Sequence, residues 1–176
     1  AIERAEGLFR QPVLVSTNGT LLTDELIERL AARRVEVQVS LDGPTAELHD
    51  AVRGEGVFAK ATGAVERLAR AGVPTIVSMV FLRGSPPLFE PMLDLAQRLG
   101  AREARFIPMR RIGAGLGCSS DAPELLPALE ALLEVLARRP ELGRLLGRDY
   151  FSVQVALARF AGARDGCGLG TDVGFI

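Results

Sequence analysis

Two stretches of sequence decide the fold: LARAGVPTIVSMV (residues 68–80) and LAQRLGAREARFI (residues 95–107). Each contains the end of an amphipathic helix, a glycine and then a strand-like run, in the same order. Glycine is well suited to the residue after a helix, where the chain often adopts a left-handed conformation, so Gly72 and Gly100 mark two helix ends. Helices that alternate with short apolar or β-branched runs are typical of parallel βα units.

The same alternation extends outward from these two stretches. It predicts four strands, at Pro12–Ser16, Val35–Leu41, Thr75–Leu82 and Ala104–Ile107. It predicts helices at Thr23–Arg34, Phe58–Ala71, Leu88–Leu99 and Pro123–Arg139, and a weaker one at Arg144–Ala161. We therefore expect an α/β fold: a partial parallel (β/α) barrel of about four βα units with C-terminal helices. A closed barrel of this kind has eight strands, so we expect a piece truncated at both ends.

Composition excludes several classes of protein. The chain has 176 residues and a net charge of −1, which favours neither a nucleic-acid nor a membrane-surface partner. It has no apolar run near the ~20 residues that cross a bilayer, and its first residues do not resemble a leader peptide, so we expect a cytoplasmic protein. Two cysteines are too few for a disulfide-stapled scaffold, and two cysteines with one histidine disfavour a Ser–His–Asp triad and an all-protein zinc site.

Polar residues gather where the first two predicted strands end, which is where parallel barrels carry their chemistry. In STNGTLL (residues 16–22), Asn18 fits an ordinary tight turn, or an amide directed into the barrel mouth. In the next strand, Gln38, Ser40 and Asp42 share one face, because strand side chains alternate. A purely hydrophobic barrel core would not contain these residues, and they suit hydrogen bonding to hydroxyl or carboxylate groups.

The residues after this strand have simpler interpretations too. Asp42-Gly43-Pro44 fits a plain turn, and His49-Asp50 fits an exposed pair or a helix cap. Arg53 is solvated unless an anion accepts hydrogen bonds from its guanidinium.

Three motifs in consistent order resemble those of radical S-adenosylmethionine (SAM) proteins. They are STNGTLL, VSLDGPTAELHDAVRGEGVF and a helix–strand pair ending in RFIPM, within residues 12–117. The nearest resemblance is to the branch with a C-terminal SPASM or twitch extension. Since the barrel of that family has six βα units, the four strands resemble units three to six. The resemblance implies a barrel part over residues 1–140, and a helical linker with the start of such an extension over residues 141–176.

The resemblance also implies which residues bind SAM. Asn18 and Ser40 line the pocket, and the Ser40 hydroxyl contacts the ribose or methionyl part. The strand that ends at Leu82 and the turn at Pro108 flank the adenine. Arg53 is a candidate partner for the SAM carboxylate, and the resemblance leaves open whether Asp42 faces SAM or the substrate.

The sequence departs from the family where the iron–sulfur cluster would bind. The CxxxCxxC loop that ligates the [4Fe–4S] cluster is missing, and so is the glycine-rich motif that binds the SAM amino group. We therefore expect no cofactor to be bound by this chain alone. Cys118 is read as an ordinary thiol. Cys167, in DGCGLG, resembles an auxiliary-cluster ligand that opens a SPASM extension, and is equally well read as a free loop cysteine.

The resemblance implies a fragment of a radical SAM oxidoreductase or maturase. In the intact protein SAM would be cleaved reductively and hydrogen abstracted from a substrate, with a peptide as one candidate. An alternative is a non-catalytic scaffold that binds a peptide or a partner. A third, an unrelated barrel enzyme with phosphate-binding loops, is disfavoured because no glycine-rich phosphate loop follows these strands. The open edge of the first strand is expected to drive self-association.

Overall fold

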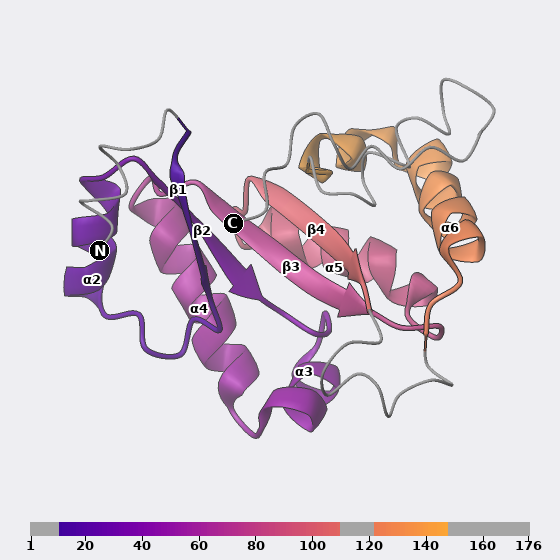
Figure 1. Ribbon diagram of the computed structural model, residues 1–176, viewed down its shortest axis with the longest axis horizontal. Coiled ribbons are helices and arrows are strands. Elements are labelled where there is room, and N and C mark those ends of the chain that lie inside the picture. Colours follow the sequence, from indigo (N-terminus) through magenta and orange to yellow (C-terminus); the bar gives the residue numbers. More distant parts are fainter. Residues whose placement is uncertain (1–10, 110–121, 148–176) are drawn as a thin grey trace.

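A computed structural model describes residues 11–109 and 122–147. Four strands form one parallel sheet in the order β1-β2-β3-β4 (Figure 1). Their bounds are Val13–Thr17, Val35–Ser40, Thr75–Phe81 and Glu103–Pro108. The four strands and the α/β class predicted from the sequence are confirmed, and each strand end lies within one residue of its predicted place.

Helices connect the strands and follow the last one. The α-helices are α2 (Asp24–Ala31), α3 (Ala46–Arg53), α4 (Val57–Arg70), α5 (Phe89–Arg98) and α6 (Leu125–Arg138). Two 3₁₀ segments are η1 (Pro86–Leu88) and η4 (Pro140–Leu145). The four stronger helix predictions are confirmed, whereas α3 was not predicted. The weaker helix expected from Arg144 onward lies mostly outside the described residues.

The repeated helix–glycine–strand arrangement has the same backbone geometry in both copies. At the end of α4, Gly72 has φ of 74°, its N–H donates to the carbonyl of Ala69, and the N–H of Val73 donates to that of Leu68. These two bonds form a Schellman motif, which satisfies the last carbonyls of a helix. Gly100 at the end of α5 also has φ of 74° and is followed by the same pair of bonds. The glycines turn the chain directly from helix into strand.

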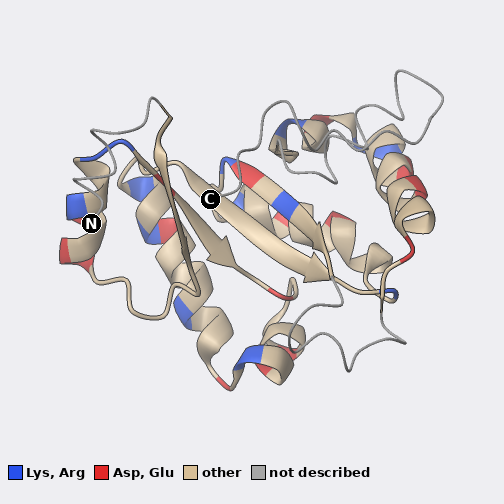
Figure 2. Cartoon of the chain, viewed as in Figure 1, with Lys and Arg blue, Asp and Glu red and all other residues tan. Residues whose placement is uncertain are grey.

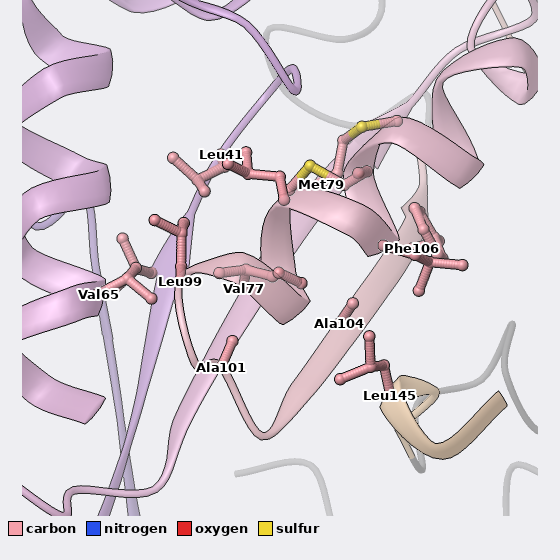
Figure 3. Close-up of a cluster of buried hydrophobic side chains, with 14 of the residues drawn as sticks. Leu41, Val65, Val77, Met79, Leu99, Ala101, Ala104, Phe106 and Leu145 are labelled. Atoms are coloured by element: carbon pink, nitrogen blue, oxygen red, sulfur yellow. The ribbon is translucent and has the colours of Figure 1, made fainter. Parts of the chain in front are cut away.

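The hydrophobic core lies between one face of the sheet and helices α4 and α5, which Figure 1 shows behind the strands. Val77, Met79 and Phe106 contribute to it from the strands, all at most 1% exposed (Figure 3). The ring of Phe106 packs on that of Phe89 in α5, with centroids 4.6 Å apart. We call this side of the sheet the helix-covered face.

The described residues on either side of position 140 share this core. Leu142 and Leu145 in η4 are 0% and 5% exposed, and Leu146 forms a parallel bridge with Ala104 of β4. The division into residues 1–140 and 141–176 stays a prediction, because most of the second part lies outside the described residues. No helix in the described ranges has the length and hydrophobicity needed to span a bilayer.

Within the described residues, β1 pairs with β2 alone, so its other edge is open. Leu14 in this strand is 47% exposed. Unpaired backbone donors and acceptors along such an edge can template pairing with another chain. The unpaired edge agrees with the expected self-association through β1, which is untested and stays a prediction.

Candidate functional site

The second face of the sheet carries Gln38 and Ser40, two of the polar residues noted in the sequence, and we call it the open face. In β2 the exposed fraction alternates, with Val35, Val37 and Val39 buried and the residues between them partly exposed. The register extends this alternation across the sheet, pairing Ser40 with Ser78 and Ser78 with Arg105. By register, the paired residues of the open face are Leu14, Ser16, Glu36, Gln38, Ser40, Ile76, Ser78, Val80, Glu103, Arg105 and Ile107. Ile76 and Ser78 are buried, at 0% and 4% exposed, and Asn18 lies just beyond the end of β1.

A polar layer crosses the middle of the open face. Ser40 and Ser78 lie opposite each other on β2 and β3, and Arg105 lies beside Ser78 on β4. Arg105 donates from Nε to Glu103 at 2.6 Å and from a terminal nitrogen to Gln38 Oε1 at 3.1 Å. Figure 2 shows acidic (red) and basic (blue) segments along β4. The hydrogen bond to Gln38 links β4 to β2 across β3, and the ion pair within β4 holds the Arg105 guanidinium in place.

Sequence reasoning did not identify Ser78 and Arg105. The signal for Ser78 was present, because it is the one hydroxyl within the apolar run IVSMV, as Ser40 is in VQVSL. Arg105 could not be placed without knowing the register between β3 and β4.

An apolar shelf lies at the carboxyl end of the open face, on β3 and β4. Val80 and Ile107 are register partners, and they are 42% and 38% exposed. Leu82, just beyond β3, is 39% exposed. Pro108 pairs with Phe81, so strand alternation puts it on the helix-covered side, and only its backbone borders the shelf. Contiguous exposed apolar side chains are typical of binding surfaces.

The turn after β1 is built locally. Asn18 Oδ1 accepts from the N–H of Thr20 at 3.1 Å and from the Thr20 hydroxyl at 2.9 Å. Gly19 has φ of +79°, and a Cβ there would lie 3.2 Å from a methyl of Val39. The plain-turn interpretation is therefore correct for the backbone. The bonds of Asn18 use its oxygen, which leaves its amide N–H groups as donors on an exposed side chain.

The segment after β2 folds back on α3 and pairs two of the predicted site residues. Arg53 Nε donates to the Asp42 carboxylate, and the two side chains are 36% and 10% exposed. Gly43 lets this segment pack closely on α3, because a Cβ at Gly43 would lie 2.6 Å from the Cβ of Leu48. Arg53 is therefore not simply solvated: its charge is paired with Asp42 at the end of β2.

The expectation of an exposed pair at His49-Asp50 is wrong for His49. This side chain is 1% exposed, and its ring lies 5.7 Å from that of Phe58. Its Nδ1 accepts the backbone N–H of Asp42 at 3.0 Å, while Nε2 is buried without a hydrogen-bond partner in the described structure. Burial lowers the pKa of His49 below the ordinary 6.5, against the opposing effect of Asp42 and Asp50.

Asp50 fulfils the other expectation, that of a helix cap. Its two carboxylate oxygens accept the N–H groups of Gly56 at 2.8 Å and Phe58 at 2.7 Å, at the start of α4. A carboxylate is favourable there because the first N–H groups of a helix have no partner within it.

The parallel strands bring the predicted site residues to one edge of the sheet. Asn18 follows β1, Ser40 ends β2 and Asp42 lies two residues beyond it. Leu82 follows β3, and Pro108 is at the end of β4. Arg53 reaches the same edge through its ion pair with Asp42. Cys118 and Cys167 lie outside the described residues, so the ligand role predicted for Cys167 is untested.

The residues of the edge suit one of the two implied cofactors and not the other. A polar half on β1 and β2 beside an apolar half on β3 and β4 suits SAM, which has a polar ribose and methionyl part and a flat adenine. A [4Fe–4S] cluster needs three thiolates in one loop, whereas this sequence has two cysteines, at 118 and 167. Within residues 11–109 and 122–147, no three His, Cys, Asp or Glu side chains are grouped to hold a metal.

Comparison with known proteins gives the family. Residues 1–99, more than half of the chain, match the family model of the radical SAM superfamily. Mycofactocin maturase MftC of Mycobacterium tuberculosis is 37% identical over 169 residues, 93% of this chain and 42% of that relative. The AdoMet-dependent heme synthase of Methanosarcina barkeri is 37% identical over 91 residues, 51% of this chain and 26% of that relative. The chain thus spans less than half the length of these relatives.

Solved structures show the same fold. The structure of anSMEcpe with bound AdoMet and the Cp18Cys peptide aligns with a TM-score of 0.63. The two sequences are 17% identical, and the alignment covers 88% of this chain and 45% of that one. The expected partial barrel of the radical SAM type is therefore confirmed.

Proposed function

We propose a function for this chain from its family and its site: it belongs to the radical SAM superfamily, and its open face binds SAM. The observation that carries the proposal is the division of the open face at the carboxyl edge. Ser40 and Asn18 present hydrogen-bonding groups on one half, and Val80, Leu82 and Ile107 present exposed apolar surface on the other. A ligand that is polar at one end and flat and apolar at the other fits both halves at once.

Each residue has a distinct role in this proposal. The Ser40 hydroxyl bonds the ribose or methionyl part, and the Asn18 amide N–H groups donate beside it. Leu82 packs on the adenine, and the backbone at Pro108 closes the other side. Arg53 remains the candidate for the SAM carboxylate, with its Nε already bonded to Asp42. Asp42 then holds Arg53 in place, so it acts on the cofactor through the guanidinium.

For the intact protein we propose an oxidoreductase or maturase that removes hydrogen from a peptide. Support comes from the name of the maturase relative and from the peptide bound in the anSMEcpe structure. The share of this chain is to bind and orient SAM and to exclude water. Since the cluster does not fit the cysteines of this chain, its three-cysteine loop would be supplied by sequence outside it, with Cys167 as a candidate ligand of an auxiliary cluster. We also propose a cytoplasmic location, which the scarcity of cysteine supports.

The test is SAM affinity, measured by equilibrium dialysis on the intact protein. Ser40→Ala should weaken SAM binding by about 0.5–1.5 kcal/mol, the usual net contribution of one hydrogen bond. Ser40→Val should weaken it further, because it adds a methyl group to the pocket while keeping strand propensity. Ser16→Ala is the matched control, since Ser16 lies on the same face but pairs with Gln38, two residues further from the edge.

Two outcomes decide between the proposals. Unchanged SAM affinity in both Ser40 variants would remove Ser40 from the site. If the intact protein, loaded with its cluster and reduced, makes no 5′-deoxyadenosine, the non-catalytic scaffold is the better description.

A separate prediction concerns the 176-residue chain alone. After anaerobic reconstitution with iron and sulfide it should hold no stoichiometric cluster, because it has no three-cysteine loop. Iron analysis giving about four irons per chain would contradict this assignment.

A further inference from the structure

The backbone N–H of Asp42 is a donor that the sheet leaves without a partner. In β2 the N–H groups of Val37 and Leu41 donate to β3, to the carbonyls of Pro74 and Ser78. In a parallel strand the alternate N–H groups point the other way, so that of Asp42 points toward β1. Since β1 ends at Thr17, opposite Val39, no strand carbonyl meets it. His49 Nδ1 accepts this bond instead, at 3.0 Å.

The bond requires one state of the imidazole. A histidine nitrogen accepts a hydrogen bond only when it carries no proton, so His49 is neutral with its hydrogen on Nε2. Several observations agree with the neutral form: the side chain is 1% exposed and it lies against the ring of Phe58. The positive charge of Arg53, on the same helix, further lowers its pKa.

We propose that His49 is a positioning residue for the cofactor site, acting by accepting the N–H of Asp42. This inference rests on the proposed function of the open face. The bond fixes the peptide that follows Leu41, and the Asp42 carboxylate is held separately by Arg53. Asp42 is thus anchored by both its backbone and its side chain, two residues beyond Ser40. Without the His49 acceptor the end of β2 loosens, and the Ser40 hydroxyl and the Arg53 guanidinium lose their fixed relation.

Three variants separate this role from that of an ordinary core residue. His49→Phe keeps an aromatic ring against Phe58 and removes the acceptor. His49→Asn offers an amide oxygen near the place of Nδ1, and His49→Gln offers one near the place of Nε2. A role in packing alone makes His49→Phe the mildest change, whereas a role as acceptor makes His49→Asn the mildest.

The first measurement is hydrogen exchange of the Asp42 amide, followed by NMR on the 176-residue chain, and it does not depend on SAM. In His49→Phe the Asp42 amide should exchange about tenfold faster than in the wild type, because a hydrogen bond that protected it is lost. In His49→Asn the rate should stay within about twofold of the wild type. Unchanged protection in folded His49→Phe would overturn the proposal.

The second measurement is the SAM dissociation constant of the intact protein, per folded molecule. We expect it to rise by about fivefold or more in His49→Phe and by less than about twofold in His49→Asn. If His49→Phe fails to fold, the comparison of His49→Asn with His49→Gln takes its place, with the weaker binding expected for Gln. Equal affinities across the variants would overturn the proposal. Should the wild type bind no SAM while Asp42 exchange still follows the acceptor, the proposed function fails and the anchoring of Asp42 stands.

Discussion

Phe106 and Ile107 are neighbours in β4, yet one is fully buried beneath α5 and the other is 38% exposed on the open face. The same contrast holds along β2, where Val39 is buried and Ser40 is partly exposed. The helix-covered face is apolar apart from the buried Thr75, while the open face combines hydroxyl, amide and charged groups with several apolar ones. One face of the sheet therefore contributes most of the buried core, and the other leaves several polar and apolar side chains accessible.

The largest difference between the two faces should appear when one side chain on each face is truncated to alanine. Phe106→Ala should lower the free energy of unfolding by about 3–5 kcal/mol, because it removes a buried ring that packs on Phe89. Ile107→Ala should cost less than about 1 kcal/mol, since much of its side chain is already in water. Urea denaturation of both variants measures the difference. Equal losses would show that the two faces contribute equally to the free energy of unfolding.

Two glycines extend this comparison to the turn after β1 and to helix α4, which packs against that turn. Gly19→Ala should destabilise the protein by about 1–3 kcal/mol, because the residue has positive φ and packs against Val39, Ala61 and Ala64. Gly63→Ala should stabilise it by about 0.4–1 kcal/mol, since Gly63 lies inside α4 with no atom within 4 Å of the added methyl. Thermal unfolding of the pair provides the test. If Gly19→Ala unfolds at the same temperature as the wild type, the turn after β1 does not require the positive φ of Gly19.

The smallest effect concerns pH and His49. The pKa of His49 is lowered in the folded state, so the unfolded chain takes up a proton first as pH falls. Stability is therefore complete above the unfolded pKa of about 6.5 and falls as pH drops toward the folded pKa, by at most ~1.4 kcal/mol per pH unit. Asp42 and Asp50 oppose this lowering, and Arg53 reinforces it.

His49→Phe isolates this contribution, because it removes the titrating group and leaves the carboxylates in place. The loss of stability between pH 6.5 and 5 should be smaller in the variant than in the wild type. Parallel curves of unfolding free energy against pH would contradict a neutral, buried His49.

Features that depend on local periodicity could be predicted from the sequence. Alternation of side chains in VEVQVS predicted that Gln38 and Ser40 share a face, and the burial pattern of β2 has that alternation. Gly72 and Gly100 marked two helix ends because positive φ favours glycine there. Both signals are local, so they can be recognised in the sequence without knowledge of the rest of the fold.

Other features could not be predicted, because they depend on contacts between distant residues. Helix α3 has no apolar stripe: Leu48 and Val52 are exposed, and its one buried residue is His49. A search for apolar periodicity passes over such a helix. Arg105 lies 67 residues from Gln38 in sequence, and only the strand register brings their side chains together.

The most direct test of the central claim is a methyl NMR titration of the intact protein with SAM, because this chain alone is not expected to hold the cofactor. If the open face binds SAM, the methyl signals of Val80, Leu82 and Ile107 should shift in proportion to occupancy. The signals of Val37 and Val77, which are buried on the helix-covered face, should stay in place. Shifts confined to the helix-covered face, or no shift at any methyl up to saturating SAM, would contradict the assignment of the open face as the SAM site.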